Sequence, residues 1–334
     1  MNLDDLVTNG LIPTAAKQSL APVAARYAVA VSSTIAELLA NEGEPLARQF
    51  LPSDAELLTL PEERADPIGD NAHSPVEGIV HRHKDRVLFK PVSVCPVYCR
   101  FCFRREMLGD ATLSTEAMDR AFAYIADHDE IWEVILTGGD PFILSPRRAE
   151  EITQRLAAIP HVKIARWHTR VPVVDPPRVT DEFVSVLKAK NLTTHVALHA
   201  NHAGEFGEAA RIAIARLVDA GIPMVSQSVL LNGVNDNVEA LEGLMRTFVE
   251  NRIKPYYLHH PDLAPGTSHF RVTIAQGQRV MRELRARLSG IAMPTYVLDI
   301  PGGHAKVPLN SDDVIALENG RHRIRDHAGV WHEY

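Results

Sequence analysis

The segment Lys90-Pro-Val-Ser-Val-Cys95-Pro-Val-Tyr-Cys99-Arg-Phe-Cys102-Phe-Arg-Arg105 contains all three cysteines of this 334-residue chain, in the spacing C-x3-C-x2-C. It follows a run of apolar residues that is typical of a buried β-strand. An odd number of cysteines within eight residues cannot form a disulfide framework. Three thiolates from one loop can instead bind three irons of a [4Fe-4S] cluster and leave the fourth iron open to another ligand. The segment therefore predicts a metal centre at the end of the first strand.

Basic residues and possible fourth ligands lie close to the three cysteines. Arg100, Arg104 and Arg105 would favour the thiolate forms and offset the negative charge of a cluster. A zinc site is the first alternative, with His81 or His83 as the fourth ligand. Zinc sites more often use two C-x2-C pairs, which disfavours this alternative. Three inert buried cysteines are a second alternative, disfavoured because the three cluster in one loop rich in tyrosine and arginine.

The composition is that of an ordinary globular protein with a net charge of -7 and 46% hydrophobic residues. Charged residues of both signs alternate along the chain without a block of lysine and arginine, which argues against a nucleic-acid partner. The acidic N-terminus Met1–Leu6 lacks an apolar signal segment. No stretch approaches the roughly 20 apolar residues that a membrane span needs. We therefore expect a cytoplasmic protein that binds neither nucleic acid nor membranes.

The chain divides into three parts by its local patterns. Residues 1–80 have a helical pattern with a cap at Ser32, and we interpret them as an N-terminal helical extension. Five prolines interrupt its later part: Pro45, Pro52, Pro61, Pro67 and Pro75. From Arg86 onward, β-branched runs alternate with amphipathic segments, which is typical of βα units in a parallel sheet. We expect the core at residues 81–292 and a C-terminal segment at 293–334.

The core is expected to contain six βα units. Their strands are expected at residues 86–94, 132–137, 162–168, 194–199, 224–230 and 253–258, and a final strand at 295–299 precedes the turn Pro301-Gly-Gly303. One of the helices shows an apolar stripe at Ala209, Ile212, Ile214, Leu217 and Val218. Such units could form an incomplete TIM-like barrel or a doubly wound sheet, and periodicity does not decide between them. In both folds the site lies at the carboxyl ends of the strands.

The cysteine spacing, with an aromatic residue before the last cysteine, resembles that of radical S-adenosylmethionine (SAM) enzymes. This resemblance implies a partial (β/α)6 TIM-like barrel of class α/β, in which SAM chelates the open iron. Leu136-Thr-Gly-Gly-Asp140 is similar to the family's GGD motif and implies that Gly138, Gly139 and Asp140 contact the methionyl part of SAM. Alone, such a turn usually just ends a strand. Gln227 is a possible further SAM contact, whereas His199 is more typical of a satisfied core residue.

Longer stretches resemble lysine 2,3-aminomutase over about residues 80–308. They include His81-Arg-His-Lys-Asp-Arg-Val-Leu88, Thr169-Arg-Val-Pro-Val-Val174, Gln227-Ser-Val-Leu-Leu-Asn-Gly-Val-Asn-Asp236, Arg252-Ile-Lys-Pro-Tyr-Tyr257 and Asp299-Ile-Pro-Gly-Gly-His-Ala-Lys306. The resemblance implies pyridoxal 5'-phosphate (PLP) as a cofactor beside the cluster and SAM. Lys306 matches the lysine that binds PLP covalently, although His304 and Ala305 stand where the family has glycines. Arg82 and Arg86 match the residues that hold the PLP phosphate.

Three further matches concern the substrate. Arg104 matches the residue that pairs with the substrate α-carboxylate. Asp262 and Asp299 match two aspartates that bind the distal ammonium group of lysine, and two carboxylates on one ammonium would discriminate against amino acids lacking it. His259-His260-Pro261 departs from the aromatic and amide residues that the family carries near the PLP ring.

The resemblance implies an isomerase that moves the α-amino group of L-lysine to the β-carbon and yields β-lysine. One alternative is the shorter relative that makes (R)-β-lysine for elongation factor P, which the chain length favours, whereas the aspartate pair favours free lysine. A 2,3-aminomutase for another amino acid and a non-catalytic zinc-binding module are further alternatives. The enzyme would need a reducing electron donor such as flavodoxin or ferredoxin, and it could form a homo-oligomer.

Overall fold

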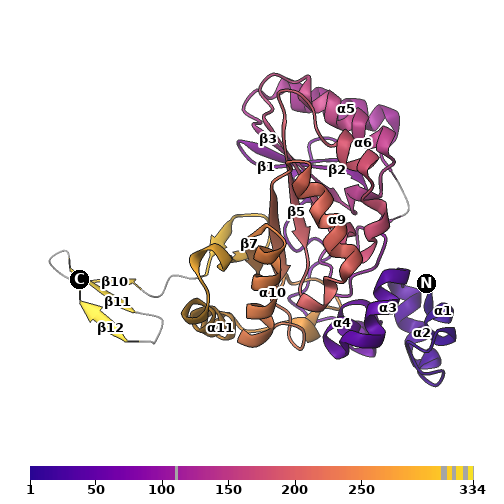
Figure 1. The fold of residues 1–334 in the computed structure, drawn as a ribbon, viewed down its shortest axis with the longest axis vertical. Helices are drawn as coiled ribbons and strands as arrows, with labels where there is room; N and C mark the ends of the chain where they lie inside the picture. The colour runs from indigo at the N-terminus through magenta and orange to yellow at the C-terminus, as the bar shows by residue number, and fades with distance from the viewer. Residues whose placement is uncertain (110–111, 310–313, 318–320, 326–329, 334) are drawn as a thin grey trace.

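The computed structural model describes residues 1–109, 112–309, 314–317, 321–325 and 330–333. Its main body is a nine-stranded sheet whose neighbouring strands follow the order of the chain (Figure 1). The strands are β1 (Ile79–His83), β2 (Arg86–Val92), β3 (Glu133–Gly138), β4 (Ile164–Thr169), β5 (Thr193–His199), β6 (Met224–Val229), β7 (Ile253–His259), β8 (Thr295–Asp299) and β9 (Lys306–Pro308). Strands β2 to β8 are parallel, whereas β1 and β9 pair antiparallel at the two edges.

The strand order decides between the two folds that the sequence left open. A doubly wound sheet needs a point at which the strand order reverses, and the order of β2 to β8 never reverses. Successive right-handed crossovers therefore place their helices on one face, and the sheet curls into an open barrel. The expected partial (β/α)6 barrel is confirmed, and every expected strand lies within two residues of an observed one.

In the described part of the barrel, six longer helices connect the parallel strands. They are α5 (Thr115–Asp127), α6 (Pro146–Ala157), α8 (Asp181–Val186), α9 (Glu208–Asp219), α10 (Val238–Glu250) and α11 (Ile274–Arg287). Shorter helical turns lie in the loops, namely α7 (Val171–Val174), η3 (Pro141–Ile143), η4 (Pro176–Arg178), η5 (Ala203–Glu205), η6 (Ser268–Phe270) and η7 (Gly290–Ala292). Among the described residues, no helix is both long enough and apolar enough to span a bilayer.

The core lies between the sheet and these helices, and α9 shows how the sequence builds it. Ala210, Ala213, Ile214 and Leu217 are buried, at the three- and four-residue spacing of a single helix face. The stripe expected from the sequence was partly wrong, because Ile212 is 48% exposed. Both faces of α9 carry apolar residues, so the strands flanking the helix decide which face is buried.

The N-terminal extension contains four helices, α1 (Leu3–Thr8), α2 (Ala16–Arg26), α3 (Ser33–Glu42) and α4 (Glu44–Phe50). Ser32 caps α3 as expected, since its Oγ accepts a hydrogen bond from the Ile35 amide over 3.2 Å. Pro45 lies in the first turn of α4, where a proline begins a helix rather than interrupting it. Residues 51–78 contain two single-turn helices, η1 (Asp54–Leu57) and η2 (Asn71–His73), so the longer helices end well before residue 80.

Several strands at the edges and near the C-terminus were not predicted from the sequence. Strands β1 and β9 each pair with a neighbour through a tight antiparallel connection. A separate three-stranded antiparallel sheet consists of β10 (Val314–Ala316), β11 (His322–Arg325) and β12 (Trp331–Glu333) (Figure 1). These strands are three to five residues long, too short for a period-two pattern to be distinguished from chance.

Candidate active site

A cavity of about 730 Å³ inside the open barrel brings together every residue that the sequence predicted for the site. It runs along the strands, from Arg86 at the start of β2 to the cysteine loop after the end of that strand. Parallel strands end at one rim, so residues far apart in the sequence meet there. The wall includes Arg82, Arg86, Cys95, Cys99, Cys102, Arg104, Gly138, Gly139, Asp140, Gln227, Asp262, Asp299 and Lys306.

The three cysteines lie in the loop between β2 and α5, where the surroundings of Cys95 and Cys102 resist ionisation of these two thiols. Burial, and then the charge of Asp140, raise the pKa of the Cys95 thiol. Burial and the neighbouring Cys99 raise the pKa of the Cys102 thiol to about 11, although Arg104 and Arg105 oppose this rise. The Cys95 and Cys102 thiols therefore keep their protons near neutral pH until a bound metal displaces them.

The arginines of the cysteine loop pair mainly with acids of the N-terminal extension. Nη2 of Arg100 lies 2.5 Å from Oε2 of Glu56, and Arg105 forms an ion pair with the same oxygen. Nη2 of Arg104 lies 3.0 Å from Oδ2 of Asp70. The two buried carboxylates thus balance part of the charge of the three arginines, while Arg104 and Arg105 still favour the thiolate form of Cys102, as expected from the sequence.

Arg170, which follows β4, contacts a thiol through its side chain. Its Nη1 atom donates a hydrogen bond to Sγ of Cys99 over 2.9 Å. Sequence reasoning missed this residue, although its position directly after a strand was a usable signal. Arg170 lies in one of the stretches that resemble lysine 2,3-aminomutase.

The zinc alternative gains no support from the two candidate histidines. Nδ1 of His81 lies 2.8 Å from the Tyr124 hydroxyl, and His81 does not line the cavity. His83 lines the cavity, and burial followed by the charge of Arg86 lowers its pKa. In the part of the chain that the structure describes, no three histidine, cysteine or acidic side chains are arranged around a single metal ion. A [4Fe-4S] cluster differs in this respect, because each thiolate binds its own iron.

The Gly138–Asp140 turn packs tightly against the cysteine loop. A Cβ atom on Gly139 would lie 2.1 Å from a carbonyl oxygen of that loop, and Gly138 has a φ of +107°. Neither position therefore accepts a larger residue. The Asp140 carboxylate accepts hydrogen bonds from Oγ1 of Thr169 and from the Arg170 amide, both over 2.7 Å. Asp140 thus joins the ends of β3 and β4 and holds the turn in place.

Lys306 reaches the cavity because of the β8–β9 connection. Asp299 and Lys306 are directly opposite each other in this strand pair. Gly302 and Gly303 reverse the chain with φ values of +91° and +79°, which glycine adopts readily. The departure from the family at His304-Ala305 is therefore compatible with the turn, since neither residue has a positive φ.

The Lys306 ammonium contacts one acid and one histidine, and its charge also acts on a second acid, Asp262. Lys306 Nζ forms an ion pair with Asp299 and lies 3.3 Å from Nδ1 of His259. Burial opposes ionisation of Asp299, but its contact with His259 and the charge of Lys306 hold its pKa well below the usual range. Burial and the negative charge of Asp299 raise the pKa of Asp262 to about 7. A second cation beside these two acids would favour the charged form of Asp262.

The three arginines predicted to bind anions are held differently. Asp70 is fully buried and pairs with Arg104 over 3.0 Å, while Nη2 of Arg82 lies 3.8 Å from its other oxygen. Burial opposes ionisation of Asp70, but Arg104 and its other basic neighbours hold its pKa below the usual value. Arg86 is more exposed and pairs with Asp85 over 2.7 Å. Asp70 therefore orients two of the three guanidinium groups.

Two histidines at strand ends line the cavity and have a buried ring nitrogen without a partner among the described residues. His168 on β4 and His199 on β5 line the cavity, and among the described residues neither Nε2 atom has a hydrogen-bond partner. Burial lowers the pKa of both rings well below the usual value. An unpaired buried polar atom beside a cavity calls for an explanation, and a bound ligand or water is one that fits here. Sequence reasoning did not single out His168 and expected His199 to be satisfied, which its Nε2 is not.

Comparison with known proteins identifies the family. The sequence model of the radical SAM superfamily matches residues 89–245, and that of lysine-2,3-aminomutase matches residues 281–334. The L-lysine 2,3-aminomutase of Acetoanaerobium sticklandii is 39% identical over 292 residues, which cover 87% of this chain and 70% of that protein. The chain belongs to the lysine 2,3-aminomutase family of radical SAM proteins.

Other members of the lysine 2,3-aminomutase family differ in the substrate that their names state. The L-lysine 2,3-aminomutase of Escherichia coli is 36% identical over 271 residues, covering 81% of this chain and 79% of that protein. The glutamate 2,3-aminomutase of Clostridioides difficile is 34% identical over 297 residues, covering 88% of this chain and 70% of that protein. Similarity over the whole chain therefore does not distinguish lysine from glutamate.

Membership of the family implies the cofactors expected from the sequence, namely a [4Fe-4S] cluster, SAM and PLP. The cavity fits these groups. Among the described residues, its wall contains three thiols of one loop, Lys306, and two histidines that each have an unpaired ring nitrogen. The thiols suit iron, the nitrogens suit a polar ligand, and the lysine suits an aldehyde.

Proposed function

We propose that this protein is an isomerase that moves the α-amino group of L-lysine to the β-carbon and releases β-lysine. The observation that carries the proposal is a single cavity whose wall contains the three cysteines, Lys306 and the acid pair Asp262 and Asp299. These groups suit the cluster, the PLP attachment and the recognition of a cationic side chain. Its relatives include aminomutases named for lysine and for glutamate, so overall similarity does not identify the substrate. The proposal of lysine therefore rests on the residues of the cavity.

The cavity wall would hold each cofactor by a different set of groups. When bound, the cluster and SAM supply a carbon radical, and PLP supplies a carbonyl carbon that binds the amino group. Gly138–Asp140 and Gln227 would contact SAM. Arg82 and Arg86 would pair with the PLP phosphate, and Lys306 would bind its aldehyde carbon. The barrel around them would keep water away from the radical.

Lys306 has to lose a proton before its nitrogen can bond to carbon. Two acceptors adjoin its Nζ atom, the Asp299 carboxylate and Nδ1 of His259 at 3.3 Å. Asp299 is the weaker base, since its pKa lies well below the usual range. Burial and the charge of Lys306 lower the pKa of His259, so its ring is neutral and able to accept a proton. We assign the role of proton acceptor to His259.

Charge complementarity favours lysine as the substrate. Arg104, oriented by Asp70, would bind the α-carboxylate. Asp262 and Asp299 would bind the ε-ammonium group, and its positive charge would stabilise Asp262 in its ionised form. A glutamate side chain would instead place a third carboxylate beside the carboxyl groups of Asp262 and Asp299. Neighbouring negative charges repel one another, which would weaken the binding of glutamate.

An anaerobic assay of the reconstituted protein with SAM, PLP and dithionite tests the proposal. We expect β-lysine from L-lysine and no β-glutamate from L-glutamate. Conversion of glutamate in place of lysine would refute the substrate assignment. A colourless protein without iron or a PLP absorption band would refute the proposal as a whole and favour the zinc-binding alternative. Chiral analysis of the product adds a further distinction, since an R product would favour supply for elongation factor P.

A further inference from the structure

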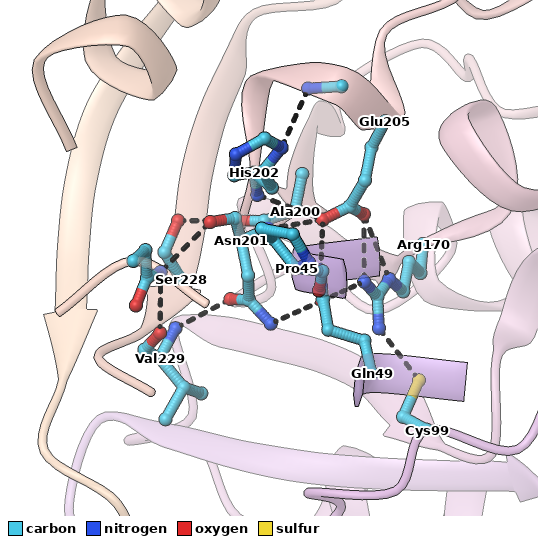
Figure 2. A network of polar contacts seen from close by, with 12 residues as sticks. Pro45, Gln49, Cys99, Arg170, Ala200, Asn201, His202, Glu205, Ser228 and Val229 are labelled. Atoms are coloured by element: carbon cyan, nitrogen blue, oxygen red, sulfur yellow. Dashed lines mark hydrogen bonds and ion pairs between the residues drawn. The ribbon is translucent and has the colours of Figure 1, made fainter. Parts of the chain in front are cut away.

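Arg170 connects the N-terminal extension to a cysteine of the loop (Figure 2). Its Nη1 atom donates a hydrogen bond to Sγ of Cys99 over 2.9 Å. Its Nη2 atom donates to Oε1 of Gln49 over 2.6 Å and to Oε2 of Glu205 over 2.8 Å. These partners come from the cysteine loop, from α4 and from η5. One guanidinium group therefore joins three segments that are far apart in the sequence.

The two oxygen partners of Arg170 are themselves held in place. The side chains of Gln49 and Glu205 are fully buried. Oε1 of Glu205 accepts hydrogen bonds from the amides of Asn201 and His202, over 2.8 and 3.0 Å. Oε1 of Gln49 also accepts a hydrogen bond from Nδ2 of Asn201 over 3.1 Å, as Figure 2 shows. This fully bonded network holds the guanidinium in one orientation.

Aromatic rings shield the same guanidinium from water. Its Cζ atom lies 4.5 Å from the ring centroid of Phe50 and 5.2 Å from that of Phe101. Phe50 ends α4, and Phe101 lies between the second and third cysteines. In surroundings of low dielectric constant, a hydrogen bond from a cation to sulfur is stronger than in water. The charge of Arg170 therefore acts on Cys99 with little screening.

We propose that Arg170 is a positioning residue that raises the reduction potential of the iron–sulfur cluster, and that Gln49 of the N-terminal extension supports it. The inference rests on the proposed function, because it assumes a [4Fe-4S] cluster on the three cysteines. Hydrogen bonds to the ligand sulfurs and nearby charge are among the features that set such potentials. Reduction adds one electron from the external donor to the cluster. A cation bonded to a ligand sulfur therefore stabilises the reduced form more than the oxidised form.

Arg170 and Glu205 should shift the potential in opposite directions. Arg170→Gln removes a cation from the cluster's surroundings and should make the cluster harder to reduce. Glu205→Gln removes the anion that offsets this cation and should make it easier to reduce. General damage to the loop would not produce shifts of opposite sign, so the pair separates a specific electrostatic effect from misfolding.

The test is a redox titration of the [4Fe-4S]2+/1+ couple, followed by electron paramagnetic resonance on the reconstituted protein. At a fixed potential, we expect Arg170→Gln to lower the ratio of reduced to oxidised cluster at least tenfold, which is about 59 mV for one electron. Glu205→Gln is expected to raise this ratio. Arg170→Lys should recover part of the loss because it keeps the charge. Gln49→Leu should lower the ratio less than Arg170→Gln does. It removes one hydrogen-bond acceptor of the guanidinium group but leaves the charge of Arg170 in place.

Arg271→Gln is a matched control. Arg271 also joins the barrel to the N-terminal extension, pairing with Glu62 over 2.9 Å and with the buried Glu63. It does not line the cavity that contains the thiols. Its replacement removes a cation between the same two parts of the protein, and we expect the potential to stay unchanged.

Iron content and the spectrum of the wild-type protein are measured first. Absence of a cluster there would refute the proposed function, and this inference with it. If the wild type holds a cluster and Arg170→Gln titrates at the same potential, only the inference is wrong. If Arg170→Gln binds no iron, the reduction potentials of Arg170→Lys and Glu205→Gln test the inference in its place. A Glu205→Gln potential equal to or below that of the wild type would overturn the inference.

Discussion

The ammonium group of Lys306 is paired with the carboxylate of Asp299, the residue directly opposite it in the β8–β9 pair. The turn through Gly302 and Gly303 fixes this register, and a slip of one residue would turn the lysine to the other face of the sheet. The pairing keeps the amine inside the cavity rather than in solvent. The placement of Lys306 in the cavity thus depends on two short strands.

Replacing Lys306 with alanine should abolish covalent attachment of PLP while the cluster stays in place. Among the described residues of the cavity wall, Lys306 is the lysine available to bind an aldehyde. We expect the imine absorption band and the borohydride-trapped label to disappear and the iron content to be unchanged. Lys84→Ala, in the exposed β1–β2 turn, is the control and should keep the imine band, the trapped label and the iron content. A band that persists in Lys306→Ala would show that another residue carries PLP.

Replacing Asp262 with asparagine should weaken the binding of L-lysine. A charged hydrogen bond of this kind contributes about 1.5 to 3 kcal/mol, so KM for lysine should rise roughly 10- to 150-fold. Asp299→Asn should have a similar effect on KM and also disturb Lys306, which makes Asp262 the cleaner test. Steady-state kinetics measure the change. Asp219→Asn, which removes an exposed surface acid, is the control. An unchanged KM in Asp262→Asn would contradict its assignment to the substrate ammonium.

The raised pKa of Asp262 predicts a pH dependence of stability in the ligand-free protein. Its pKa is about 7 in the folded state and about 3.9 in an unfolded chain. The folded state therefore keeps the proton of Asp262 to a higher pH than the unfolded chain does. As the pH rises from about 4 to about 7, Asp262 increasingly destabilises the folded state. Relative to the wild type, Asp262→Asn should gain about 1 to 2 kcal/mol in free energy of unfolding between about pH 5 and pH 8, allowing for partial screening.

Urea denaturation at these two pH values measures the difference between Asp262→Asn and the wild type. Saturating L-lysine should reduce it, because a bound ammonium group favours the charged form of Asp262. A difference that stays constant with pH would show that Asp262 does not titrate in this range.

Replacing Glu56 with glutamine should destabilise the cysteine loop. Glu56 is the shared carboxylate partner of Arg100 and Arg105, and all three side chains are buried. Removing its charge leaves two buried guanidinium groups without this counter-charge, at a cost of about 3 to 5 kcal/mol. We expect a lower denaturation midpoint and lower iron occupancy after reconstitution. Glu62→Gln, which breaks a more exposed ion pair with Arg271, should cost less than about 1 kcal/mol. Equal midpoints and iron contents in both variants would contradict this role for Glu56.

Much of the candidate site could be predicted from the sequence because its signals are local. The spacing of Cys95, Cys99 and Cys102, the glycines before Lys306 and the apolar periodicity of the strands all depend on residues close together in the chain. Local order determines which thiols share a loop and where the backbone can turn. Parallel strands then bring these local features to one cavity, whose wall contains every predicted residue.

The sequence by itself thus determined the cysteine loop and the parallel strands of the barrel. Only the tertiary structure decided which charges meet. Arg100 adjoins Cys99 in the sequence but pairs with Glu56, whereas Arg170 arrives from another strand and bonds to Cys99. The strand order, which selected an open barrel over a doubly wound sheet, was likewise decided in three dimensions. The physical reason is the same in both cases, because ion pairing and strand pairing depend on distances across space that a local pattern does not encode.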